Sequence, residues 1–563
     1  MDVTYLALGG RRVRAAVAHT AQLAADGTPV TLVTTAGSEW DGVPIPPGVT
    51  LRRVRTPRAA RPLIAAAGTL YAGDPEALAE AYATGRPGVL LEPSADPARR
   101  PQPADLAVLT PWYPSPDDPF AGAFVQAATA AVTGDFARVS VLHTQSWFYS
   151  PGRLPGQLLG VAAERQALRS GNTVVLDTAE GELARVATPT PGGGDYLAYA
   201  DEQTRALRAA LPTGRIEAPV VHAHTGLMGG VVAARLARPD ARIVVTEHAT
   251  FLALAFAQPG VQRRYAAMLA RADAVLCVGR ALRDQLAGIF PEHAGKLRIV
   301  PNAIDFDRFA VRAEPPREPL RWLYLGRMME HKGVLTLLGA FARVAAEDPR
   351  VTLTLVGGGP LDAEIDRRLA ECRARPDADP TPPQRWADRV IRRPPVPPEQ
   401  VTALLHEHDL LVHASRRETF GMTVVEAVAT GTPVLVARSE GPAETLDGIE
   451  DLAGALFEPT DDPAVIVAAY RELKARFAAL DLAGARTQLL ARYGTEAVRA
   501  QLRQAYTAGA PPSSATVPEP ARLPLRRLPS PVPEALVRTG VRVARRVSGS
   551  AVRPWPRPRR PPG

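Results

Sequence analysis

Short apolar runs recur along the chain, and each is followed by a stretch in which apolar residues return every three or four positions. Such runs are typical of buried parallel strands, and the longer spacing is typical of helices that pack on a sheet. The alternation predicts an α/β fold with largely parallel sheets. The expected strands cover residues 3–8, 30–34, 106–109, 138–142, 219–224, 242–248, 274–278, 320–325, 351–356, 409–414 and 433–437.

Four regions follow from this pattern. With 563 residues, the chain exceeds the size of about 250–300 residues at which one core stops growing, so several domains are expected. Residues 1–100 are expected to form an additional α/β module without a recognisable chemistry, which ends in a Pro- and Arg-rich linker at residues 93–103. Two further domains of alternating strands and helices are expected at residues 105–309 and 317–509. Residues 510–563, rich in Pro and Arg, predict a disordered tail.

Charge is concentrated in that tail. Residues 511–563 hold eleven Arg and two Glu, a net charge of +9, whereas the rest holds 55 basic and 56 acidic side chains, a net charge of −1. The folded part therefore lacks the excess of positive charge that nucleic-acid binding requires, and no nucleic-acid partner is expected. A solvated tail is favoured, and a peripheral membrane contact through a short basic helix is the alternative.

Cysteine content and hydropathy exclude further classes. Cys277 and Cys372 are the only cysteines, too few for a disulfide scaffold or a cysteine zinc site. The apolar runs are shorter than the roughly 18 residues that span a bilayer, and the first residues do not resemble a secretory signal. The expected class is a soluble cytoplasmic protein, with peripheral attachment to the inner face of the membrane as the alternative.

A candidate phosphate site follows the strand at 320–325. Residues 326–333 read GRMMEHKG and open a helix, so Arg327 and Lys332 are expected at the carboxyl end of a parallel strand beside a helix N-terminus. Ligands bind at this edge of open α/β sheets, and two cations with free backbone N–H groups suit a diphosphate. The glycine turn at 357–359 follows the next strand and permits close approach of a ligand. Taken alone, the two cations are better explained as surface charges on the loop between a strand and a helix.

A second candidate lies at residues 415–427, SRRETFGMTVVEA. Glu418 is expected in a loop after a strand, and Gly421 opens a helix that carries Glu426 about one turn inside. Carboxylates accept paired hydrogen bonds from vicinal hydroxyls, so two of them suit a sugar and a ribose. The alternative makes Glu418 a helix N-terminal acid and Glu426 a solvated residue.

Histidines mark the second region. His248 ends the strand at 242–248 and is expected to face a cleft, where it is either functional or structural. His222 and His224 share one face of a strand, which is half of a metal site. Since no matching third ligand stands out in the sequence, a structural or acceptor-contacting pair is favoured.

Taken together, these motifs resemble the retaining glycosyltransferases of family 4, which have the GT-B fold of two Rossmann-like domains facing a cleft. Glu418 and Glu426 are similar to the family's E-x7-E motif, and residues 326–333 to its G-R-x4-K-G element. Residues 301–305 (PNAID) resemble the interdomain hinge, and residues 112–115 with 122–125 resemble the start of the acceptor domain. The resemblance covers about residues 105–508. Ala303, Ala414 and Glu440 depart from the residues that are usual there.

The resemblance implies a role for each motif. Arg327, Lys332, Glu418 and His248 would be the catalytic set, and Asn302 would lie at the hinge. The implied activity is metal-independent, retaining transfer of a hexosyl group from a nucleotide-diphosphate sugar to a hydroxyl acceptor, lipid-linked or not, without a cofactor. The implied donor-binding residues are Gly122, Gly326, Gly357, Gly358, Phe420, Gly421, Met422 and Glu426.

Two alternatives stay open on the sequence. One is a phosphorylase or nucleotide-sugar epimerase of the same fold, distinguished by phosphate as acceptor or by isomerisation without transfer. The other is a non-catalytic sugar-binding or assembly subunit. The complete set of Arg327, Lys332, Glu418 and Glu426 favours an enzyme.

Overall fold

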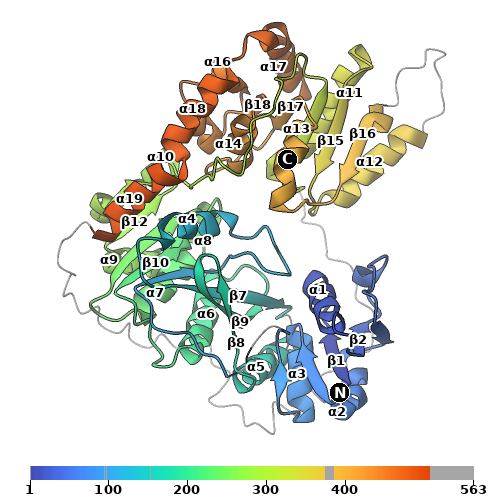
Figure 1. Cartoon of the computed structure of the whole chain (residues 1–563), viewed down its shortest axis with the longest axis vertical. Helices are drawn as coiled ribbons and strands as arrows, with labels where there is room; N and C mark the ends of the chain where they lie inside the picture. Colours follow the sequence, from blue (N-terminus) through green and yellow to red (C-terminus); the bar gives the residue numbers. More distant parts are fainter. Residues whose placement is uncertain (1, 94–95, 97, 152–153, 375–385, 508–563) are drawn as a thin grey trace, which may run out of the picture.

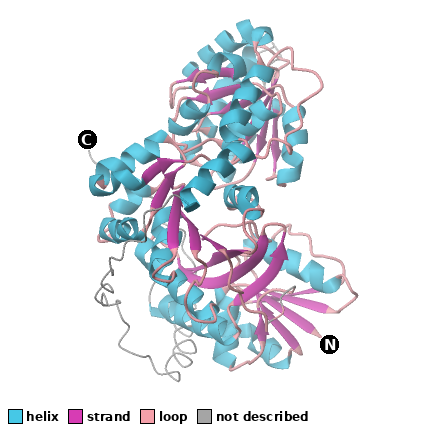
Figure 2. Cartoon of the chain, turned by 60° about the vertical axis from the view of Figure 1, so that its left-hand side comes forward, coloured by secondary structure: helices cyan, strands magenta, loops and turns pink. Residues whose placement is uncertain are grey.

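The structure, a computed structural model, describes residues 2–93, 96, 98–151, 154–374 and 386–507 (Figure 1). These residues form three α/β units, each built on its own sheet and covered by helices (Figure 2). The described residues contain no helix long and apolar enough to cross a membrane. The predicted tail at 510–563 lies outside the described residues.

The first unit is a five-stranded parallel sheet of order β3-β2-β1-β4-β5. Strands β1 and β4 are neighbours although α1, β2, β3 and α2 lie between them in sequence, so this is a doubly wound sheet. The elements are β1 (Val3–Ala7), α1 (Val13–Ala24), β2 (Val30–Thr35), β3 (Val49–Val54), α2 (Arg61–Ala66), β4 (Thr69–Ala72), α3 (Pro75–Thr84) and β5 (Val89–Leu90).

The second unit has eight strands in the order β13-β12-β11-β10-β6-β7-β9-β8, of which only β8 runs antiparallel to its neighbour. The elements begin with β6 (Leu106–Thr110), α4 (Ala123–Thr133), β7 (Val139–Tyr149), α5 (Leu154–Arg169), β8 (Thr173–Thr178), β9 (Gly181–Pro191), α6 (Tyr196–Ala210), β10 (Val220–His224) and α7 (Val231–Leu236). They continue with β11 (Arg242–Glu247), α8 (Leu252–Phe256), α9 (Val261–Arg271), β12 (Ala274–Cys277), α10 (Arg280–Ile289) and β13 (Leu297–Ile299).

The third unit is a six-stranded parallel sheet of order β16-β15-β14-β17-β18-β19. Its first elements are β14 (Arg321–Leu325), α11 (Val334–Glu347), β15 (Thr352–Val356), α12 (Asp362–Ala374), β16 (Val390–Arg393), α13 (Val401–His406), β17 (Leu410–His413), α14 (Met422–Ala429) and β18 (Val434–Ala437). The chain continues with α15 (Glu440–Thr445), α16 (Glu450–Ala453), β19 (Gly454–Phe457), α17 (Pro463–Arg476), α18 (Leu482–Tyr493) and α19 (Thr495–Thr507).

The predicted α/β class and its parallel sheets are confirmed, since all eleven predicted strands are present. The largest difference lies in β7, which continues to Tyr149 because its distal half pairs with β9. Eight strands were not predicted, namely β3, β4, β5, β8, β9, β13, β16 and β19. Of these, β3, β8 and β9 carry arginines, threonines or prolines where a buried strand is expected to be apolar, and they lie at or near sheet edges. The other five are only two to four residues long.

The first unit shares a core with the second. Leu78 and Tyr82 of α3 belong to one apolar cluster with Trp147 of β7 and Ala162 of α5. Beyond this cluster, the Arg185 guanidinium of β9 pairs with the Glu92 carboxylate just after β5, and both side chains are buried. The expected additional module is therefore fixed to the second unit by packing as well as by the linker.

The last helix of the predicted domain at 317–509 packs on the second unit. Figure 1 shows α19, at the red end of the colour scale, beside α4. Val498 and Leu502 of α19 join the apolar cluster that contains Val125 of α4. The Tyr506 hydroxyl and Nδ1 of His222 are hydrogen-bonded at 2.8 Å. The chain thus returns to the second unit after it completes the third.

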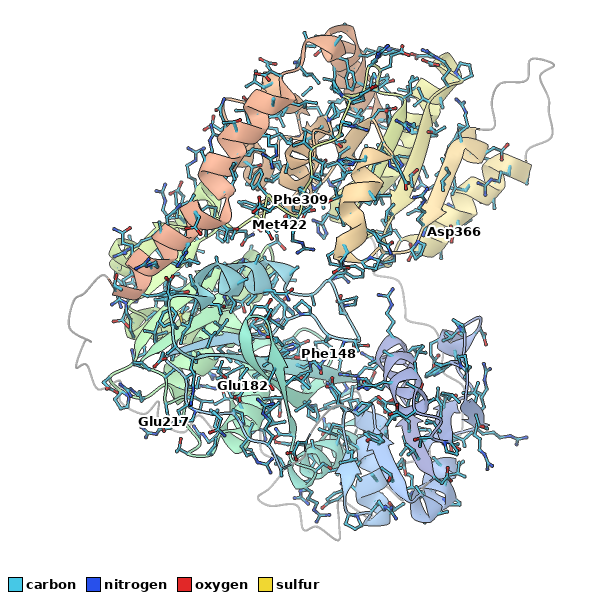
Figure 3. All side chains as sticks on the ribbon, in the orientation of Figure 1. Phe148, Glu182, Glu217, Phe309, Asp366 and Met422 are labelled. Atoms are coloured by element: carbon cyan, nitrogen blue, oxygen red, sulfur yellow. The ribbon has the colours of Figure 1, made fainter. Side chains whose placement is uncertain are left out.

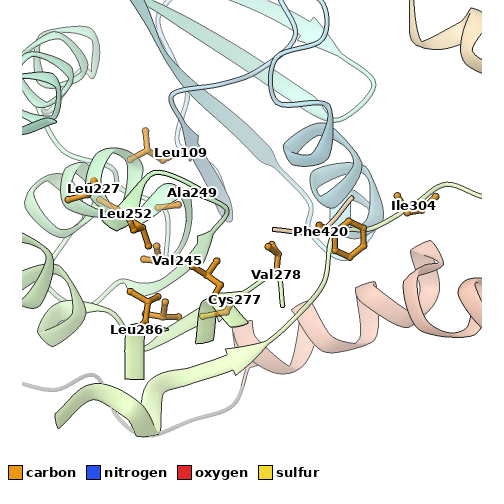
Figure 4. Close-up of a cluster of buried hydrophobic side chains, with 14 of the residues drawn as sticks. Leu109, Leu227, Val245, Ala249, Leu252, Cys277, Val278, Leu286, Ile304 and Phe420 are labelled. Carbon is orange, nitrogen blue, oxygen red and sulfur yellow. The ribbon is translucent and has the colours of Figure 1, made fainter. Parts of the chain in front are cut away.

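The two connections between these units lie side by side. The backbone N–H of Ile304 donates to the carbonyl of Tyr493 at 2.8 Å, and Ile304 forms an isolated parallel bridge with Gly494. Figure 4 shows Ile304 close to Phe420 of the third unit and Val278 of the second, all three members of one buried cluster. The second and third units therefore share apolar packing next to both segments that connect them.

Candidate functional site

Three loops of the third unit meet at the carboxyl ends of β14, β15 and β17. The N–H of Gly326 donates to the carbonyl of Val356 at 3.0 Å, and the N–H of Met328 donates to that of Gly358 at 3.1 Å. Gly357 has φ 136°, and a Cβ there would lie 1.9 Å from the carbonyl oxygen of Gly326. Only glycine fits at this position, so the two predicted glycine motifs form one tightly packed edge.

Lys332 and Glu418 come together at this edge. Lys332 ends a short 3₁₀ turn (Glu330–Lys332), and Gly333, with φ 68°, then begins α11. A Cβ on Gly333 would lie 2.1 Å from the carbonyl oxygen of Ala414, so the Lys332 turn rests directly on the loop after β17. Nζ of Lys332 lies 2.6 Å from Oε2 of Glu418. The sequence predicted each residue at the site, but not their mutual ion pair.

His413 is a third member that sequence reasoning missed. It ends β17, is buried, and places Nε2 3.8 Å from Oε2 of Glu418. Burial raises the pKa of Glu418, but the nearby His413 ring and the charge of Lys332 outweigh it, so the pKa lies well below its usual range. Glu418 is therefore an ionised acceptor. The available signal was a single polar residue at the end of an apolar strand, which alone is weak.

The Glu418 loop is held from two sides. The N–H of Gly441 donates to the backbone carbonyl of Glu418 at 2.8 Å. The Thr419 hydroxyl donates to the backbone carbonyl of His248 at 3.2 Å, a direct hydrogen bond between the third and second units. The sequence did not single out Thr419. The Thr419–His248 hydrogen bond places the Glu418 loop, which we refer to as the donor loop, against the end of the strand that leads to His248.

Helix α14 presents the remaining predicted donor residues. Gly421, at φ 89°, begins the helix, and Met422 is its first residue. Phe420 is buried and packs edge-on against Tyr493 at 5.2 Å, so its side chain is part of the interdomain core. Glu426 is half-buried, and burial raises its pKa to about 7 against the opposing charge of Arg308. Ionisation of the Glu426 carboxyl group is costly in this site, but it becomes favourable once hydroxyl groups donate hydrogen bonds to the carboxylate.

On the second unit, His248 lies among aromatic rings. Its Nε2 is hydrogen-bonded to Nδ1 of His224 at 2.9 Å, and its ring lies 4.3 Å from that of Phe124 in α4. Gly122 begins α4 with φ 68°, and a Cβ there would lie 2.0 Å from the carbonyl oxygen of Trp112. His248 and the Gly122 turn therefore belong to one corner of the second sheet.

The neighbouring histidines are a structural cluster. Nε2 of His222 is hydrogen-bonded to Thr246 Oγ1 at 2.7 Å, and burial lowers the pKa values of His222 and His248 to about 3. His222 is hydrogen-bonded to Thr246 of β11 and to Tyr506 of α19, and His224 is hydrogen-bonded to His248. These contacts within the protein are those expected of the structural alternative for His222 and His224. Within the described part of the chain, no group of three or more His, Cys, Asp or Glu residues has the arrangement of a metal site.

Arg327 and Asn302 complete the predicted set. The Arg327 side chain is exposed, and its backbone carbonyl accepts a hydrogen bond from Tyr324 at 2.8 Å. Among the described residues, no hydrogen bond or ion pair joins the Arg327 guanidinium to Lys332 or Glu418. Asn302 is buried two residues before the Ile304 crossing, beside the interdomain connection.

Comparisons with known proteins agree with this arrangement. Residues 173–308 match the family model Glycosyltransferase Family 4, and residues 319–475 match the model Glycosyl transferases group 1. The two matches lie on the second and third units. The motif resemblance is thereby confirmed.

Two relatives and one solved structure illustrate the similarity. The glycogen synthase of Mycobacterium tuberculosis is 27% identical over 342 residues, 56% of this chain and 77% of that protein. The D-inositol 3-phosphate glycosyltransferase of Nocardia farcinica is 31% identical over 186 residues, 31% of this chain and 39% of that protein. Sucrose-phosphate synthase from Thermosynechococcus elongatus aligns in three dimensions with a TM-score of 0.53 at 19% identity, over 71% of this chain and 98% of that one. At this identity, the alignment supports the two-domain fold alone.

Proposed function

The chain belongs to the glycosyltransferases of family 4 and has the GT-B fold, and we propose that it transfers a hexosyl group with retention from a nucleotide-diphosphate sugar to a hydroxyl acceptor. The observation that carries the proposal is the cluster of Lys332, Glu418 and His413 at the carboxyl edge of the third sheet. The Thr419–His248 hydrogen bond supports it, because it joins this cluster to the second unit.

Each residue has a distinct part in this proposal. Lys332 carries fixed positive charge at the position where a departing diphosphate becomes more negative, and Arg327 supplies a second, exposed cation nearby in sequence. Glu418 is held ionised and accepts hydrogen bonds from hydroxyls of the donor sugar. Glu426 accepts from the ribose diol, and the N–H groups at the start of α14 face phosphate oxygens.

The bond changes are those of a front-face substitution. The bond between the anomeric carbon and the phosphate oxygen breaks, and the acceptor oxygen bonds to the same face of that carbon. The acceptor proton passes to the departing phosphate, so no protein base is needed. His248, whose pKa burial lowers to about 3, is a neutral ring beside the donor sugar in this proposal. No metal takes part.

Three chemical classes of acceptor belong to this proposal. The names of the similar proteins suggest a glucan chain, as for the glycogen synthase, or a phosphorylated polyol, as for the D-inositol 3-phosphate glycosyltransferase. A lipid-linked hydroxyl and a peripheral membrane contact remain part of the proposal for the acceptor side.

The test is a screen of nucleotide sugars for hydrolysis and for thermal stabilisation of the full chain. A ligand at about 100 times its Kd stabilises the fold by about 2.7 kcal/mol. NMR of the anomeric proton in the transfer product reports retention or inversion, and activity in excess EDTA reports on metal. Inversion contradicts the mechanism. Use of phosphate as acceptor, or epimerised donor without transfer, indicates the alternative enzymes of this fold.

A further inference from the structure

Five aromatic side chains form a continuous row on the second unit. Trp112 contacts Phe251 at a ring-centroid distance of 6.3 Å, and Phe251 stacks on Tyr196 at 5.1 Å with an angle of 6° between the ring planes. Tyr196 contacts Tyr199 at 5.8 Å, and Tyr199 contacts Phe148 at 5.7 Å. We refer to these five residues as the aromatic row.

The row follows the ligand-binding edge of the sheet. Trp112 lies in the loop after β6, and Phe251 in the loop after β11. Tyr196 and Tyr199 stand in the first turns of α6, which follows β9, and Phe148 is at the carboxyl end of β7. Carboxyl ends of parallel strands form the edge at which open α/β sheets bind ligands. The row thus gathers residues from the carboxyl ends of β6, β7 and β11 and from the helix that follows β9.

Packing within the protein accounts for only part of the row, since Tyr196 and Phe251 also pack against a buried apolar cluster while Phe148 does not. Trp112, Tyr196, Tyr199 and Phe251 are all half-buried, and Phe148 is 40% exposed. Along β7, the neighbours Trp147 and Tyr149 point to the opposite face, where they join the core shared with the first unit. Figure 3 shows Phe148 on the side of the second unit that faces the first and third units. A contiguous row of partly exposed aromatic rings offers edges and faces on which a ligand can pack.

One end of the row adjoins the proposed catalytic edge. Phe251 follows His248 by three residues, and the His248 carbonyl accepts the hydrogen bond from Thr419 in the donor loop. The Trp112 backbone lies close to the Gly122 turn, since a Cβ on Gly122 would lie 2.0 Å from the Trp112 carbonyl oxygen. The other end reaches the first unit, where Arg11 donates to the Ser150 hydroxyl at 3.0 Å, two residues beyond Phe148. An occupant of the row would therefore extend from the donor site to the first unit.

We propose that the aromatic row is the acceptor-binding surface for an extended neutral glycan, which rests on the proposed function because it names the acceptor of the same site. The weakly positive C–H groups on one face of a pyranose ring pack on the negative face of an aromatic ring. Tyrosine adds a hydroxyl that hydrogen-bonds to sugar hydroxyls, which an acyl-chain groove does not need. Four successive ring contacts form a track, which suits a chain of sugars better than a single one.

The experiment measures retention of the full chain on arrays of neutral oligosaccharides of increasing length in several linkage series. Phe148→Ala removes the far ring, and Phe251→Leu keeps apolar bulk but removes the aromatic face nearest the donor loop. Leu254→Ala is the matched control, because Leu254 is 68% exposed in α8 and is not in the row. Melting temperatures of all variants establish that they are folded.

We expect the affinity of the unmodified chain to increase with glycan length. Each ring removed should weaken retention by about 3- to 10-fold, with Phe148→Ala affecting only the longer glycans, and Leu254→Ala should leave it unchanged. The proposal is overturned if no linkage series is retained, if Phe251→Leu binds as well as the parent, or if decyl-chain detergent competes with every retained glycan.

A parallel measurement of nucleotide-sugar hydrolysis separates the two proposals. Leu254→Ala should hydrolyse the donor at the parent's rate, because Leu254 lies outside the row and outside the donor site. Lost glycan retention in Phe148→Ala, with retention and hydrolysis both kept in Leu254→Ala, supports the row. Absence of hydrolysis in the unmodified chain for every nucleotide sugar would count against the proposed function, whatever the array shows.

Discussion

The ammonium group of Lys332 lies 2.6 Å from the carboxylate of Glu418, so two residues expected to contact separate parts of a donor form one ion pair. The pair joins the loop after β14 to the loop after β17. It fixes the Glu418 carboxylate and keeps it ionised, and it makes the function of either residue dependent on the other.

Lys332→Ala should lower turnover by about 10²–10³, the effect typical of losing one preorganised electrostatic donor. Nucleoside diphosphate binding should weaken less, because the interaction grows as charge develops on the departing group. Steady-state kinetics with varied donor, together with calorimetric titration of the diphosphate product, measure the two effects. Lys474→Ala is the matched control, since Lys474 pairs with Asp348 at 3.0 Å away from this edge. Unchanged turnover together with much weaker binding of the nucleoside diphosphate would show that Lys332 binds the ground state and the transition state equally well.

Glu426 should make donor binding and stability depend on pH in opposite senses. Its pKa is raised from 4.5 to about 7, so the folded chain holds a proton between these values that the unfolded chain has lost. The stability contribution of this group therefore falls as pH rises through that range. Affinity for a nucleotide sugar should instead rise as Glu426 ionises near pH 7. Calorimetry and thermal melting across pH 5–8, by comparison with Glu426→Gln, check both trends. A parent profile as flat as that of Glu426→Gln would refute the assignment.

Tyr506→Phe should destabilise the second unit even though Tyr506 lies beyond the third in sequence. The change removes the hydroxyl bonded to Nδ1 of His222 and leaves that buried nitrogen without its partner. The expected loss is about 1–3 kcal/mol in the free energy of unfolding. Thr507→Ala, an exposed change in the same helix, should stay within about 0.5 kcal/mol. Urea unfolding measures both, and equal effects would show that α19 contributes little at this point.

Glu92→Ala should loosen the first unit from the second. Arg185 would remain buried and without its partner carboxylate, which typically costs about 3–5 kcal/mol. Asp177→Ala breaks the pair with Arg99 at the surface and should cost less than about 1 kcal/mol. Limited proteolysis of the 93–103 linker provides a second measurement, because cleavage should accelerate only in Glu92→Ala.

Features of the fold that depend on residues close together in sequence were predicted correctly. The helix starts at Gly333 and Gly421 require positive φ, and a buried strand precedes each loop, so the motifs fell at the expected strand ends. The α/β class and the central parallel strands followed from apolar runs alone. These features depend on neighbours within a few residues, which a single sequence displays directly.

Features that depend on distant partners were not predictable. The pair of Lys332 and Glu418 needs the register of β14 beside β17, and the Thr419–His248 bond needs the relative placement of two units. The same holds for the crossing of α19, whose apolar stripe gives no sign of which unit it covers. His413 was missed because one polar residue at a strand end is common.

The return of α19 to the second unit makes the third unit an insertion within the second, with a consequence for synthesis on the ribosome. Residues 310–494 must emerge before α19 does, which takes roughly 10–40 s at about 5–20 residues per second. During that interval, the apolar face of α4 that Val498 and Leu502 finally cover stays open on the nascent chain. Although most of the second unit is translated before the third, it can close only after the third has been made.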